Sequence, residues 1–194
     1  MAVTMNKVLG EAFGPQTGAA RAAKDVALVL GGIALLTLAA KIRVPMWPVP
    51  ITMQTFAVLA LGAGLGLRLG LVSVLGYLAL GAAGFAVFTG EGAGLAYIAG
   101  PTGGFLAGFA LAAAAMGLLA RRGWDKTVLG MAGAMLIGTA IIYTVGLGWM
   151  AHLFAAEHGL AWVFEKGMLP FLPGDALKLV LAALVVPGLW KLAR

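Results

Sequence analysis

The sequence consists mainly of long uncharged apolar segments that alternate with short polar or basic stretches. A helix needs roughly 20 apolar residues to cross a bilayer. Four segments approach this length: 26–40, 69–88, 101–120 and 128–151. Two more complete the pattern: 51–67, which only Arg68 separates from the next segment, and 173–190, which contains Asp175 and Lys178. The pattern predicts an all-α integral membrane protein, a compact bundle of six transmembrane helices.

Composition agrees with this prediction and narrows the possible functions. Hydrophobic residues make up 62% of the 194 residues and charged residues 10%, which excludes a soluble domain. The 30 Gly residues favour close contacts between helices, because small side chains let backbones approach each other. Without any Cys, the chain forms neither disulfides nor thiolate metal sites. The net charge of +6 comes without a basic stripe of interleaved aromatic residues, so we expect no nucleic-acid partner.

The positions of Lys and Arg predict the orientation in the membrane. With a cytoplasmic N-terminus, nine of them fall on the cytoplasmic side: Lys7, Arg21, Lys24, Arg68, Arg121, Arg122, Lys126, Lys191 and Arg194. Lys41, Arg43 and Lys166 then lie in outer loops, and Lys178 lies within a span. This bias follows the positive-inside rule. We therefore expect both termini in the cytoplasm.

The connecting segments divide the chain further. Residues 1–24 lack the apolar core of a signal peptide and are predicted to be a cytoplasmic tail, followed by a membrane domain over residues 25–194. The inner loops are short and basic, whereas the outer connections at 41–53, 88–100 and 151–172 are longer and carry polar residues. Any functional site is therefore expected on or under the outer face.

The stretch FLPGDALKL, residues 171–179, places two charges at the start of the last span. Asp175 falls in the first helical turn, where a carboxylate can accept hydrogen bonds from free backbone amides and lies at the positive end of the helix dipole. Lys178 can then extend towards the membrane interface. The alternative is a ligand site. Residues three positions apart share a helix face, and an ionisable pair inside a membrane is by default a functional site. Such a pair offers an acceptor and a donor to a small polar molecule.

Other polar residues near the outer face give weaker signals. GPTGG, residues 100–104, opens the fourth apolar segment, so the amides near Thr102 either receive an acidic group or simply begin a helix. Gln54, at the top of the second segment, either binds a ligand or satisfies loop backbone. His152 and His158 lie six positions apart without a third ligand, so we expect no metal site.

Small residues recur at intervals of four in two places. One series, in the fourth segment, is Gly100, Gly104, Gly108 and Ala112, and it predicts a close contact inside the bundle. The other series, on the first helix, is Ala23, Ala27 and Gly31. It is either internal packing or a docking face for a partner.

Three separated motifs resemble a known family. VPITMQT, GPTGGFLAGF and FLPGDALK, in this order and within six short spans, are similar to the BioY family, the biotin-specific S-components of energy-coupling-factor (ECF) transporters of bacterial cytoplasmic membranes. The resemblance covers roughly residues 25–192. It implies biotin bound beneath the first and third outer loops, with Asp175 and Lys178 in the site. It also implies that Ala23, Ala27 and Gly31 contact a transmembrane coupling subunit that is linked to ATPase subunits.

The chemistry of biotin fits this implication. Asp175 suits the ureido N–H groups, and Lys178 can donate to the ureido carbonyl or balance the Asp charge. Candidates for the carboxylate are Thr102, Gln54 and Arg43, and candidates for apolar walls are Phe85, Phe88 and Tyr97. Family members often have an Asn near the third outer loop, and this sequence has none between Phe88 and Gly100.

Two other functions remain open. The chain would act as a stand-alone ion-coupled transporter of small solutes if Asp175 were a proton site. A membrane aspartyl protease would need a second buried Asp beside Asp175, but Asp25 and Asp125 are predicted at the inner boundary, so we expect no enzyme and no cofactor. The sequence contains no phosphate-binding loop of the ATPase type, so ATP-driven import would require other chains.

Overall fold

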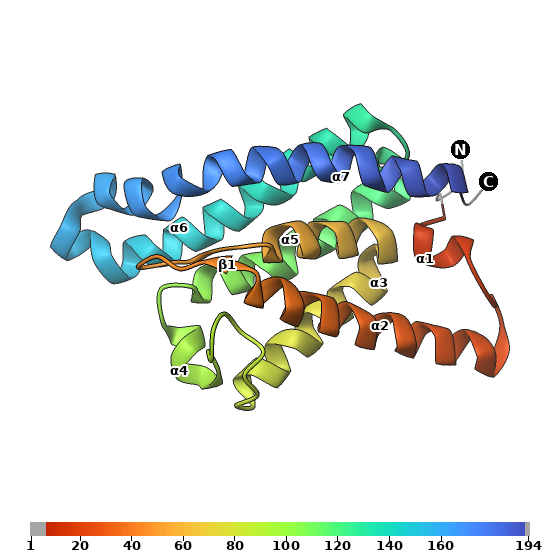
Figure 1. The fold of residues 1–194 in the computed structure, drawn as a ribbon, viewed down its shortest axis with the longest axis horizontal. Coiled ribbons are helices and arrows are strands. Elements are labelled where there is room, and N and C mark those ends of the chain that lie inside the picture. Colours follow the sequence, from red (N-terminus) through yellow and green to blue (C-terminus); the bar gives the residue numbers. More distant parts are fainter. Residues whose placement is uncertain (1–6, 193–194) are drawn as a thin grey trace.

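The computed structural model describes residues 7–192 of the chain, and Figure 1 shows that most of them are helical. The α-helices are α1 (Leu9–Ala12), α2 (Gly18–Lys41), α3 (Gln54–Ala82), α4 (Gly94–Ala99), α5 (Gly103–Arg121), α6 (Val128–Gly167) and α7 (Leu172–Leu192). Two single 3₁₀ turns, η1 (Trp124–Lys126) and η2 (Leu169–Phe171), flank α6. Two short strands, β1 (Arg43–Val44) and β2 (Ile51–Thr52), pair antiparallel between α2 and α3.

The prediction of six apolar helices is confirmed, with one of the turns at a different residue. α3 contains two of the predicted spans, which separate at Gly66, where φ is 76° and only a glycine is unstrained. The chain reverses direction there and brings Gly70 against Gly62 of the preceding span. A Cβ on Gly70 would lie only 3.0 Å from the Cα of Gly62. The other spans are α2, α5, α7 and the part of α6 before a second break at Gly159.

α5 forms the centre of the bundle. In its apolar window 67% of the residues are buried, compared with 17% for α2, which lies at the periphery. A Cβ on Gly104 would lie 2.2 Å from the Cβ of Trp149, and one on Gly108 would lie 3.0 Å from the Cα of Ile142. The small residues of α5 therefore let α6 approach closely, which confirms the predicted internal contact.

Two loop segments cover the end of the bundle that lies opposite α1. The β1–β2 hairpin presents Trp47, whose ring contacts the rings of Phe154 and Trp162 on α6. Lys41 donates hydrogen bonds to carbonyl oxygens of the loop after α3, at 2.7 Å from Ala86 and 3.0 Å from Phe88. These contacts fix both loops over the helix ends.

The N-terminal part of the chain departs from the predicted tail. α2 begins at Gly18, eight residues before the predicted span, and α1 precedes it. Residues 1–6 of the predicted tail lie outside the described residues. α1 and the last turn of α7 lie at the same end of the molecule in Figure 1.

Candidate ligand-binding site

A cavity lies beneath the hairpin, between the first turns of α3, α5 and α7 and the middle of α6. Its empty volume is about 590 Å³, a figure that includes the open mouth. Small-molecule sites in proteins are mostly apolar with a few polar groups that fix orientation. This cavity has that character, because most of its polar side chains form two separate groups within apolar walls.

The first group is charged and joins α3, α6 and α7. Lys178 donates to Asp175 Oδ1 at 3.0 Å and to the hydroxyl of Thr55 at 2.9 Å, while the Tyr143 hydroxyl donates to the other oxygen of Asp175. The Asp175 and Lys178 side chains are 12% and 8% exposed. The i,i+3 spacing places both on one face of α7. The structure therefore brings the two predicted charges together inside the cavity, with Lys178 turned inward.

The second group is neutral. The Gln54 amide nitrogen donates to the Tyr77 hydroxyl at 2.7 Å, and the Gln54 amide oxygen lies 3.3 Å from the hydroxyls of Thr52 and Thr89. Because Tyr77 accepts from Gln54, its own proton is free to donate elsewhere. Tyr77 is fully buried, and Gln54 is 4% exposed. This network, which we call the amide group, presents a donor from a fixed position in the cavity wall.

Aromatic side chains form much of the remaining wall. Phe88 stacks on Tyr97 with ring centroids 4.9 Å apart and meets Tyr77 edge to face at 5.4 Å. Phe88 lies against Gly81, where a Cβ would come within 2.0 Å of the ring. The ring of Phe105 on α5 also meets the ring of Tyr143 edge to face. The predicted wall residues Phe88 and Tyr97 do line the cavity.

Phe85 does not line the cavity, and that prediction was wrong. The ring is 60% exposed. α3 ends at Ala82, earlier than expected, and the chain then turns at Gly84, where φ is 99°. The turn directs Phe88 inward and leaves Phe85 outside.

Arg43 and Thr102 lie towards the outside. A second hollow shares Pro50, Thr89, Tyr97 and Thr102 with the cavity, and Arg43 lines it. Arg43 is exposed, on the β1 strand opposite Thr52. An elongated ligand with its head in the cavity would therefore extend its tail towards a cation.

Other predicted residues lie outside the cavity. Ala23, Ala27 and Gly31 are all exposed on α2, and a Cβ on Gly31 would meet no atom within 4 Å. His152 and His158 are exposed at the end of α6. In the part of the chain that the structure describes, no group of three His, Cys, Asp or Glu residues is placed to hold a metal ion.

Sequence reasoning missed several members of the site. Tyr77 and Tyr143 each interrupt an apolar span, and a polar side chain at such depth is a signal that was available. Thr55 and Thr89 gave no comparable signal, because threonine is common in loops and near helix ends. Their roles depend on which residues the fold brings opposite them.

The whole chain has known relatives. The model of the BioY family matches residues 7–194. The probable biotin transporter BioY of Pyrococcus horikoshii is 38% identical, over 86% of this chain and 96% of that protein. The biotin transporter BioY of Thermotoga maritima is 36% identical, over 85% and 96%. A crystal structure of the S-component for biotin from an ECF-type ABC transporter superposes with a TM-score of 0.79 at 25% identity, over 91% of this chain and 95% of that one.

Proposed function

We propose that this chain, which belongs to the BioY family, is the biotin-binding S-component of an ECF-type transporter in the cytoplasmic membrane. It captures biotin at the outer face, and partner subunits supply the energy of ATP hydrolysis. The observation that carries the proposal is the Asp175–Lys178 pair, held by Tyr143 and Thr55 inside an otherwise apolar cavity. Burying an ion pair in a membrane bundle carries a large desolvation free energy, and a ligand that binds to both charges explains its presence.

The binding mode follows from the polarity of the cavity. The ureido ring lies at the charged group, where Asp175 accepts from N–H and Lys178 donates to the carbonyl oxygen. The thiophane ring packs against the stacked rings of Phe88 and Tyr97. The valerate tail points to the mouth, where Arg43 and Thr102 receive the carboxylate.

The amide group compensates for the Asn that the loop at residues 88–100 lacks. Gln54 and Tyr77 come from α3 rather than from that loop, and Thr89 of the loop reaches them with its hydroxyl. A fixed donor from Tyr77 is able to replace the missing side-chain amide. This assignment makes α3, not the loop, the second source of hydrogen bonds to the ligand.

The exposed small-residue face of α2 is the proposed docking site for the coupling subunit. Ala23, Ala27 and Gly31 carry no bulk that would hold another helix away, and they lie on the most peripheral span. The chain itself has no nucleotide-binding motif, so the coupling subunit and its ATPase subunits complete the transporter. With both termini inside, α1 and the last turn of α7 lie on the cytoplasmic side.

Titration calorimetry on the purified chain in detergent tests the ligand. We expect one biotin per chain, weaker binding of a biotin amide that lacks the carboxylate charge, and no heat with thiamine. A response to another vitamin but not to biotin would refute the assignment and leave the fold intact. In liposomes, uptake by the chain alone that follows a proton gradient would support the ion-coupled alternative, in which Asp175 carries a proton.

A further inference from the structure

The N-terminal segment, residues 7–16, is inserted between α2 and α3. Val8 is fully buried, and its methyl groups lie 3.2 Å from the position of a Cβ on Gly66, at the break in α3. A Cβ on Gly10 would lie 3.3 Å from Leu65 of α3 and 3.6 Å from Leu28 of α2. The segment therefore fills the space between the two helices at this end of the bundle. We call it the N-terminal wedge.

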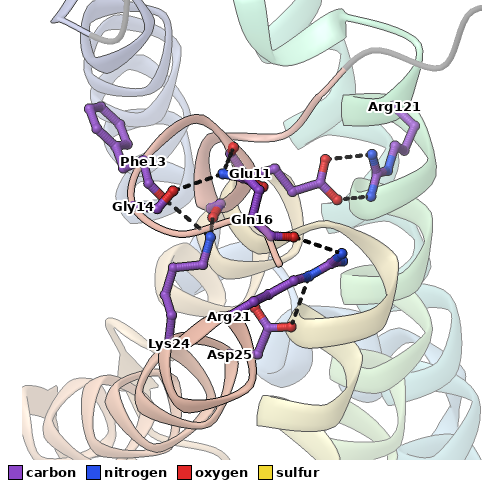
Figure 2. A network of polar contacts seen from close by, with 9 residues as sticks. Glu11, Phe13, Gly14, Gln16, Arg21, Lys24, Asp25 and Arg121 are labelled. Carbon is purple, nitrogen blue, oxygen red and sulfur yellow. Dashed lines mark hydrogen bonds and ion pairs between the residues drawn. The ribbon is translucent and has the colours of Figure 1, made fainter. Parts of the chain in front are cut away.

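Polar contacts fix the wedge on both sides (Figure 2). On one side Glu11 forms a bidentate ion pair with Arg121 of α5, whose Nη1 donates to Glu11 Oε2 at 2.7 Å. Burial favours the neutral form of Glu11, but the hydrogen bond and charge of Arg121 outweigh it and hold its pKa below the ordinary value. On the other side Lys24 of α2 donates to the carbonyl oxygens of Gly10 and Phe13, each at 3.1 Å. The wedge thus connects α2 to α5 across the break in α3 at Gly66.

We propose that the N-terminal wedge is a positioning element for partner docking: it sets the direction of the first half of α2, which carries Ala23 and Ala27. The inference rests on the proposed function, in which that face binds the coupling subunit. The buried residues of α2 all lie in its second half: Gly32, Leu36, Ala39 and Ala40. Lys24 turns inward to the wedge while Ala23 and Ala27 on the same two turns stay exposed.

Glu11 and Lys24 act on docking through the helix they position, and neither lines the biotin cavity. The variants Glu11→Gln and Lys24→Met each remove one connection of the wedge. Breaking a bidentate, partly buried ion pair shifts the equilibrium between the attached and the released wedge by about five-fold. Glu11 and Lys24 lie on opposite sides of the wedge. Glu157→Gln is a matched control, because it removes the same charge from a side chain that is 79% exposed at the far end of α6.

Two measurements separate positioning from general stability. The chain has no Cys, so spin labels on Ala22→Cys in α2 and Leu118→Cys in α5 report the direction of α2 without interference. We expect Glu11→Gln plus Lys24→Met to broaden this distance distribution and to lower the yield of complex with the co-expressed coupling and ATPase subunits about five-fold or more. Biotin affinity should stay within about two-fold, and Glu11→Asp should recover most of the yield.

Three results would overturn the inference. An unchanged label distance in the double variant means that the wedge does not set α2, whether or not a complex forms. A yield that rises means that the wedge obstructs docking instead. A parallel loss of biotin affinity and melting temperature, without recovery by Glu11→Asp, means that the segment only stabilises the fold. If the unmodified chain fails to bind biotin, the proposed function fails separately, and the label distance still tests the wedge.

Discussion

Replacing Asp175 by Asn tests the charged group of the site most directly. The carboxylate accepts from two donors, the Tyr143 hydroxyl and the Lys178 ammonium, which is 3.0 Å away. An amide of the same shape keeps one acceptor and presents an NH₂ group in place of the other. One of the two donors must therefore face another donor, and Lys178 loses its counter-charge at a position that is 7% exposed.

The magnitude follows from these contacts. Two unit charges at this separation attract by roughly 5 kcal/mol in an effective dielectric constant near 20, and desolvation offsets much of this attraction. A hydrogen bond from the ligand N–H to a charged acceptor contributes about 1.5–3 kcal/mol. The Asp175→Asn variant should therefore bind biotin about ten- to a hundred-fold more weakly. Lys178→Met should also weaken binding, because the ureido carbonyl loses its donor.

A double-mutant cycle on biotin affinity by calorimetry is the assay, with folding followed separately by thermal melting in detergent. The double variant should lose less than the sum of the two single losses, because the charges act as a unit. Asp25→Asn is the matched control, since Asp25 pairs with Arg21 at 3.8 Å at the other end of the bundle. Strict additivity would refute the pairing argument. Unchanged biotin affinity together with a lower melting temperature would show that Asp175 stabilises the start of α7 and has no role in binding the ligand.

Two further predictions concern the opposite end of the molecule. Ala27→Trp should leave biotin affinity unchanged and reduce ATP-driven uptake by about ten-fold or more, whereas Ala140→Trp, on an exposed position of α6, should not; equal loss of binding and uptake would show that Ala27 is packing. Burial raises the pKa of Asp125, although the hydrogen bond from Trp190 and the charge of nearby Lys126 oppose this shift. The folded state therefore favours the neutral carboxyl. Its contribution to the free energy of unfolding is complete below about pH 4 and declines as pH rises. The melting temperature of Asp125→Asn minus that of the parent should therefore be larger at pH 8 than at pH 5, and the opposite trend would contradict the argument.

Most of the fold could be predicted from the sequence because the bilayer imposes lengths on apolar segments. The six spans emerged from this constraint alone. The apolar pattern predicts the boundary between the second and third spans at Arg68, and this is wrong, because the chain reverses at Gly66. A positive φ leaves no trace in hydropathy, and the sequence around it offers three glycines within five residues. The wedge was missed for a related reason, since a four-residue helix such as α1 has no periodic pattern to detect.

The site was predictable where a single residue contradicts its surroundings. Asp175 and Lys178 are charges in an apolar span, so their positions alone indicated a site. Gln54 lies at the start of α3, where the sequence predicts the top of the second span, but its partners Tyr77 and Thr89 lie 23 and 35 positions further along the chain. Contacts over such separations depend on how the two halves of α3 and the following loop pack, and hydropathy contains no information on that packing.

The hydrogen bonds among the cavity residues also indicate how the protein can be selective. In the part of the chain that the structure describes, the one buried side-chain oxygen or nitrogen without a hydrogen-bond partner is Asp125 Oδ1, which lies outside the cavity. Each buried side-chain oxygen and nitrogen of the charged group and of the amide group therefore has at least one hydrogen-bond partner within the protein. A ligand that displaces Lys178 from Asp175 or Thr55 must replace those bonds in full, because a buried charge left unpaired is strongly destabilising. An analogue without the ureido N–H or carbonyl would leave such groups unpaired, and it is rejected by more than the loss of one hydrogen bond.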